Sequence, residues 1–192
     1  NIMCFSFEVS IGTFLSSWGI LLYLLKKRKL SKKNKQSIIF LMIFSSMQLA
    51  DAILWYNNMK MNNINYYVSS IFIPLILSLQ IIYNIYIRND GKYVILNIIA
   101  PIICVLIFMK FNGYTTTSIC KNKFSSPVWA SNEIKLYEMV LFAIFVIYPN
   151  WIYLFIACFI LFPFLYFFIN SSYGSLWCFI ANFLSLYYLI TL

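Results

Sequence analysis

Three carboxylates, Glu8, Asp51 and Glu138, lie within or at the edge of long apolar stretches of this 192-residue sequence. Ionisable groups inside apolar membrane segments are costly, and where they occur they typically bind cations or exchange protons. Glu138 has Lys135 three residues away, so we expect these two side chains to pair. Glu8 and Asp51 are therefore the strongest candidates for a functional role.

Pairs of polar residues at helical spacing accompany the carboxylates. The pairs are Gln48 with Asp51, Gln80 with Asn84, and Asn182 with Ser185. Residues three or four apart share one face of a helix, so each pair predicts a polar stripe. The functional interpretation is a partly hydrated cavity, open from outside, formed by Glu8, Gln48, Asp51, Gln80, Asn84 and Asn182. The alternative is that the stripes only hydrogen-bond one helix to another.

The elements that carry these residues follow from the composition. The chain is 62% hydrophobic, 20% aromatic and only 10% charged, which excludes both a soluble globular domain and a disordered chain. We predict a single all-α domain, a polytopic integral membrane helix bundle. Seven transmembrane helices are expected, at about 4–25, 37–56, 67–87, 93–109, 135–148, 151–169 and 175–192, with an outer loop at 110–134.

The fifth of these segments is the least regular. The apolar segment that follows the outer loop is too long for one helix, and Pro149 with Asn150 is its only obvious helix-breaking signal. Dividing it there leaves 135–148 short, so this segment either crosses the membrane with a strong tilt or is re-entrant.

The basic residues predict the orientation. Half of them form one run between the first two helices: Lys26, Lys27, Arg28, Lys29, Lys32, Lys33 and Lys35. Such runs mark the cytoplasmic side of a membrane protein, which places the N-terminus outside and, after seven spans, the C-terminus inside. The net charge of +9 therefore predicts that this loop contacts anionic lipid headgroups and not nucleic acid.

Several chemistries are excluded by residue type. The sequence has no histidine, which removes the commonest metal ligand and general base, and the last helix has no lysine to hold retinal. We expect no metal, no cofactor and no enzymatic activity. Cys4 and Cys120 both fall on the predicted outer side, where an oxidising environment would allow a disulfide between them.

Three motifs resemble an uncharacterised family of multi-span membrane proteins from large DNA viruses and some microbial eukaryotes. The motifs are Met3-Cys4-Phe5-Ser6-Phe7-Glu8-Val9-Ser10, Met47 to Trp55, and Gly174 to Asn182. The family often has Trp at the position of Phe5 and usually Glu at that of Asp51. The resemblance implies Met3 as the natural start and no known activity.

Two functions remain open at this stage. The first is a transporter or channel-like protein for protons or small cations that uses the outer carboxylates. The second is a non-catalytic component of a viral or organellar membrane, in which the polar interior serves packing alone. The approach of Glu8 to Asp51 across a cavity would favour the first.

Overall fold

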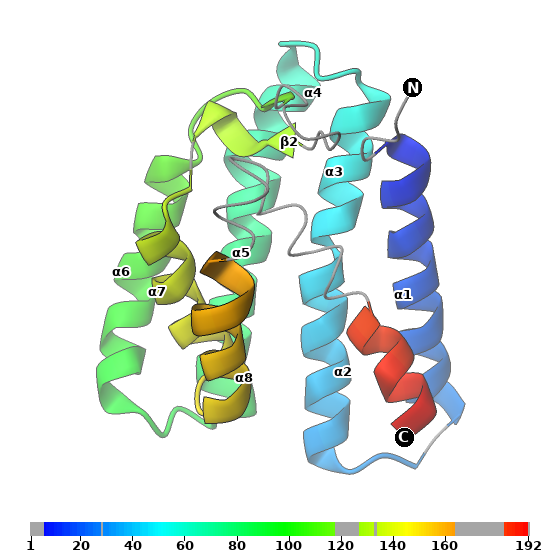
Figure 1. Ribbon diagram of the computed structural model, residues 1–192, viewed down its shortest axis with the longest axis vertical. Coiled ribbons are helices and arrows are strands. Elements are labelled where there is room, and N and C mark those ends of the chain that lie inside the picture. Colours follow the sequence, from blue (N-terminus) through cyan, green and yellow to red (C-terminus); the bar gives the residue numbers. More distant parts are fainter. Residues whose placement is uncertain (1–5, 28, 118–126, 133, 164–182, 192) are drawn as a thin grey trace.

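The chain folds into an array of helices. A computed structural model describes residues 6–27, 29–117, 127–132, 134–163 and 183–191. Within these residues the only strands are β1 (Thr116–Thr117) and β2 (Pro127–Val128), which form one short antiparallel pair. The long helices stand side by side and successive ones run in opposite directions (Figure 1). The predicted all-α class is confirmed.

Three helical segments are long and apolar enough to cross a membrane. The first is α1 (Phe7–Lys27), and the second joins α2 (Lys32–Ser45) to α3 (Met47–Tyr56). The third joins α4 (Asn63–Tyr67), the π-helical η1 (Val68–Phe72), α5 (Ile73–Ile82) and the π-helical η2 (Tyr83–Arg88). They coincide with the first three predicted spans, although the second and third begin four or five residues earlier than expected.

The remaining described helices are shorter. They are α6 (Val94–Lys110), α7 (Leu136–Ile147), α8 (Trp151–Phe155) with the π-helical η4 (Ile156–Leu161), and residues 183–191. The expected division at Pro149 is present, because α7 ends before it and α8 begins after it. At 1.5 Å per residue α7 is only about 18 Å long, against about 30 Å for a hydrocarbon core.

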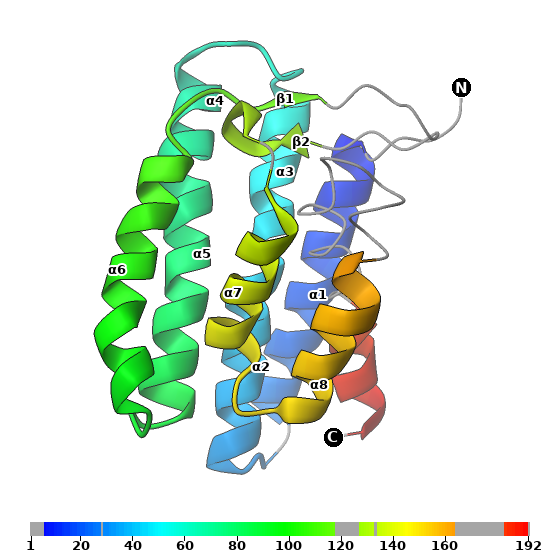
Figure 2. The ribbon, with the colours of Figure 1, turned by 60° about the vertical axis from the view of Figure 1, so that its left-hand side comes forward.

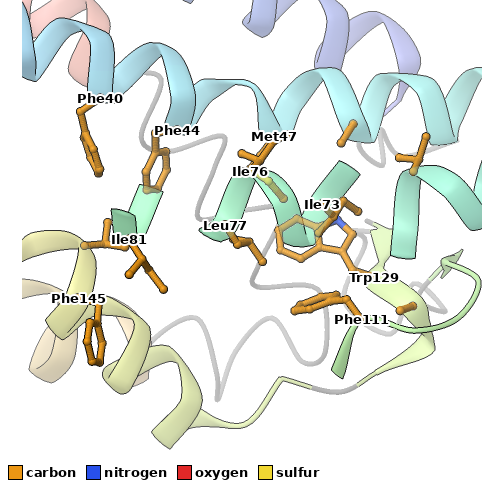
Figure 3. Close-up of a cluster of buried hydrophobic side chains, with 14 of the residues drawn as sticks. Phe40, Phe44, Met47, Ile73, Ile76, Leu77, Ile81, Phe111, Trp129 and Phe145 are labelled. Carbon is orange, nitrogen blue, oxygen red and sulfur yellow. The ribbon is translucent and has the colours of Figure 1, made fainter. Parts of the chain in front are cut away.

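The main hydrophobic core lies between the α2–α3 segment, α5 and α7. Figure 3 shows Phe40, Phe44 and Met47 opposite Ile76 and Ile81, with further core side chains around them. These positions recur at helical spacing, so each helix presents one apolar stripe to the others. By contrast, an outward face of α6 is exposed and entirely apolar: Val94, Ile95, Ile98, Ile102, Val105 and Met109.

The segment predicted as a plain outer loop has a definite structure where it is described. After α6 the chain forms β1, and β2 leads into a short 3-10 turn, η3 (Trp129–Ser131). These elements lie at the same end of the bundle as the connection from α3 to α4 (Figures 1 and 2). We call the described part of this segment, residues 111–117 and 127–132, the cap.

Candidate functional site

The polar interior begins at a seam between α1 and α3. Gln48 is 1% exposed, and its Oε1 accepts a hydrogen bond from Thr13 Oγ1 at 3.2 Å. On either side of Thr13, at helical spacing, Ser10 and Ser17 are also buried. Small polar side chains of this kind let two helices approach closely and hydrogen-bond to each other within a membrane. The predicted Gln48 stripe therefore meets a matching stripe on α1 that the sequence analysis did not single out.

Asp51 is one turn further along α3 and meets the cap. Its side chain is 2% exposed, and its Oδ1 accepts a hydrogen bond from Trp129 Nε1 at 2.9 Å. Asp51 precedes the last residue of α3, Tyr56, by five residues, so the contact lies about 7 Å inside the end of the helix. The cap consequently reaches into the bundle instead of lying over it.

A buried network ties the cap to the third helical segment. Asn65 Nδ2 donates to the Thr115 carbonyl at 2.9 Å, and Asn65 Oδ1 accepts from the Thr115 amide at 2.8 Å. The Thr115 hydroxyl lies 2.6 Å from Ser69 Oγ and accepts from the Ala130 amide at 3.1 Å. Buried backbone outside helices and sheets needs protein groups to satisfy its hydrogen bonds, and these side chains do so.

Asn84 joins helices at the opposite end of the third segment. Its Nδ2 donates to the carbonyl oxygens of Phe145 and Tyr148, both at 2.9 Å. Its Oδ1 accepts from the Arg88 guanidinium at 3.0 Å, and that guanidinium lies 4.7 Å from the centre of the Phe40 ring. Asn84 thus uses both ends of its amide to hold α7 and Arg88 in place.

Five other residues bury polar side-chain atoms that make no hydrogen bond within the described residues. These atoms are both amide atoms of Gln80, Gln48 Nε2, Trp55 Nε1, Ser78 Oγ and Asn97 Oδ1. A buried polar atom without a partner costs about 1–3 kcal/mol. Gln80, which is 1% exposed, is therefore the buried side chain that packing explains least.

Glu8 and Asp51 occupy different environments. Glu8 is exposed in the first turn of α1, where its carboxylate accepts a hydrogen bond from Ser6 Oγ at 2.6 Å. Asp51 is buried beneath the cap. The sixth candidate, Asn182, lies outside the described residues, as do Cys4 and Cys120, so the proposed disulfide stays a prediction. Cys104 and Cys158 are free thiols.

Glu138 forms an ion pair, but with a different lysine than expected. Its carboxylate binds the Lys110 ammonium group at the end of α6. Lys135 contributes its backbone: its amide donates to Glu138 Oε2 at 2.7 Å, and its carbonyl oxygen accepts from the Glu138 amide at 3.0 Å. The pair joins α6 to α7 just below the cap, so its role is to hold two helices together.

The basic run lies beside the charged turn that follows η2 and contains Asp90. Lys32 Nζ is 3.8 Å from Asp90 Oδ1, and Gln36 Nε2 donates to the Ile87 carbonyl at 2.9 Å. The α1–α2 connection and the turn after η2 therefore share one end of the bundle (Figure 1). Arg28 and the side chain of Lys27 are not described.

Searches against protein-family models, curated proteins and solved structures give no match to this chain. The resemblance to viral multi-span proteins accordingly stays a prediction based on its three motifs. The described residues contain no group of three or more His, Cys, Asp or Glu side chains arranged to hold a metal ion.

The sequence analysis did not identify the residues that pack against or hydrogen-bond to the predicted polar stripes. Ser10, Thr13 and Ser17 carried a usable signal, because small polar residues recur there at helical spacing within an apolar stretch. Asn65 and Trp129 carried none. Each lies in a segment that reads as a polar loop or an interfacial anchor, and its partner is distant in the sequence.

Proposed function

We propose that the chain is a multi-pass integral membrane protein with seven spans, an outer N-terminus and a cytoplasmic C-terminus. Three long apolar helices, the exposed apolar face of α6 and the position of the basic run at one end of the bundle all support this arrangement. The basic run contacts anionic lipid headgroups. The function is non-catalytic: the protein is a structural component of a viral or organellar membrane.

The contact between Asp51 and Trp129 carries this proposal. A carboxylate that binds and releases a cation or proton needs access to water. Asp51 instead accepts a hydrogen bond from the indole N–H of Trp129 at a buried position beneath the cap. Glu8 lies at the exposed end of α1. This pairing suits a group that joins the cap to α3.

Transport of protons or small cations is the second candidate, and one observation favours it. The amide of Gln80 is buried and has no hydrogen-bond partner among the described residues. Asn84 lies four residues further along the same helical segment. A polar side chain held in this state at membrane depth is typical of groups that meet an ion or water during transport.

Flux through proteoliposomes distinguishes the two functions. The purified protein is reconstituted with a proton-sensitive dye, or a potassium- or sodium-sensitive dye, inside the vesicles, and a gradient is imposed. We expect the rates of protein-containing and empty vesicles to be equal. Transport would instead appear as a rate above that of empty vesicles, lowered by Asp51→Asn or Gln80→Leu and unchanged by Lys60→Ala in the exposed connection before α4.

A further inference from the structure

A groove on the surface of the bundle lies between α7 and the helix formed by α8 and η4. Its volume is about 780 Å³, within the range of about 300–1,000 Å³ typical of ligand sites. The described walls are apolar and include Val140, Ile144, Ile152, Phe155 and Phe159, with one sulfur from Cys158. Leu154, which lines the groove, belongs to one buried cluster with Ala143 of α7 and Ala157 of η4.

Aromatic rings mark one end of this groove. Trp151, which is 66% exposed, lines the groove and stands edge-on to Tyr148, with ring centres 5.1 Å apart. Tyr148 in turn meets Tyr93 at 4.7 Å. Tryptophan and tyrosine prefer the headgroup level of a bilayer, so this row of rings places the groove's end at the membrane surface.

Positive charge lies beside the same row of rings. Lys92 is exposed and directly precedes Tyr93. The turn that carries it is held next to the basic run by the contacts of Lys32 with Asp90 and of Gln36 with Ile87. From Trp151 the groove extends to Phe159, a rise of about 12 Å, which is close to the depth of one leaflet, about 15 Å.

We propose that this groove binds one anionic phospholipid. An acyl chain lies between α7 and α8 along Ile152, Phe155 and Phe159, its glycerol region lies against Trp151 and Tyr148, and its phosphate pairs with Lys92. Apolar walls, interfacial rings and a basic residue follow one another in the order in which a phospholipid presents its tail, glycerol and headgroup. The inference rests on the proposed membrane location, and it adds a specific lipid ligand to it.

Photocrosslinking tests the site in the full-length protein. The chain is reconstituted in phosphatidylcholine vesicles with a trace of either phosphatidylglycerol or phosphatidylcholine that carries a diazirine on one acyl chain. After irradiation, lipid adducts are quantified by mass spectrometry on two segments, 136–161 for the groove and 94–110 for the exposed face of α6. The α6 segment reports contact with bulk lipid.

The expected result is a preference for the anionic probe in the groove alone. One lysine near an anionic headgroup favours binding by about fivefold, so adducts on 136–161 should show that ratio while those on 94–110 show none. Lys92→Ala should abolish the preference and Lys60→Ala should preserve it. Val140→Phe, which fills the groove, should lower the yield of both probes on 136–161, whereas Val105→Phe on α6 should not.

Three outcomes would overturn the proposal or its foundation. Equal ratios in both segments would mean that the groove sees only bulk lipid. Adducts on α6 without any on 136–161 would mean that protein, from this chain or a second copy, covers the groove. An absence of adducts from both segments would contradict the membrane location itself, which separates that failure from failure of the lipid site.

Discussion

Trp129 and Trp55 show how the same side chain can have opposite energetic consequences. The indole of Trp129 donates to a buried carboxylate, whereas that of Trp55 is buried without a partner in the described part of the chain. A hydrogen bond to a charged group contributes about 1.5–3 kcal/mol, and its loss leaves the carboxylate oxygen without that donor. Polar burial is therefore favourable only where the fold supplies the partner.

Replacing each of the two tryptophans by phenylalanine tests this difference. Trp129→Phe should lower the free energy of unfolding by about 1.5–3 kcal/mol, because it removes the donor to Asp51 and keeps most of the ring. Trp55→Phe removes an indole N–H that makes no hydrogen bond to the described residues and should change stability by less than about 0.5 kcal/mol. Denaturant unfolding in detergent micelles measures both, and equal losses would contradict the role of the Asp51 contact.

Asn84 and Gln80 form a second matched pair. Asn84→Leu removes the donor to two carbonyl groups at the end of α7 and should destabilise the protein by about 1–3 kcal/mol. Gln80→Leu replaces an amide that has no partner among the described residues by an apolar side chain of similar size, so stability should stay equal or rise. Thermal unfolding in detergent compares them. A large loss for Gln80→Leu would show that Gln80 has a partner in the native protein.

The cap compensates for a short helix. Because α7 is only about 18 Å long, the chain between α6 and α7 continues along the bundle without helical hydrogen bonds. Side chains of α4 and η1 supply the missing bonds, with Asn65 and Ser69 on Thr115 and Ser70 on Gly113. These side chains therefore hold the cap together with the short β1–β2 pair.

Asn65 is the residue on which the cap depends most. Asn65→Ala should leave the Thr115 amide and carbonyl without their partners and open the cap locally, because local opening depends on such specific bonds. Hydrogen exchange at the amides of Thr115 and Ala130 should become faster by about tenfold or more, which corresponds to 1.4 kcal/mol. Asn63→Ala, at an exposed position of α4, is the control, and equal exchange in the two variants would refute this role.

The sequence predicted the helices far better than the contacts between them. Long apolar stretches define α1, the α2–α3 segment and the α4–η2 segment, because a membrane-length helix is encoded locally. The contacts of Asp51 with Trp129 and of Asn65 with Thr115 join residues 78 and 50 positions apart, and no local pattern encodes them. Glu138 is the clearest case, since the nearby Lys135 was expected but Lys110, 28 positions away, forms the ion pair.

The two ends of the bundle differ in charge, and its sides are apolar. Lysines of the basic run and Lys92 lie at one end, whereas the cap and the connection before α4 occupy the other (Figure 1). Between the ends, α6, α8 and η4 expose Ile95, Ile102, Ile152 and Phe159 by more than half. Exposed apolar faces of this extent are rare on soluble monomers and are normal where lipid is the solvent.

The sidedness of the two ends tests this membrane arrangement most directly. In a background lacking the five native cysteines, a cysteine is introduced at Asn34, in the basic end, or at Asn63, at the opposite end. Intact cells expressing each variant are treated with a membrane-impermeant maleimide. We predict labelling of the Asn63→Cys variant from outside and labelling of the Asn34→Cys variant only after permeabilisation. Labelling of Asn34→Cys in intact cells, or equal labelling of both variants there, would contradict the arrangement.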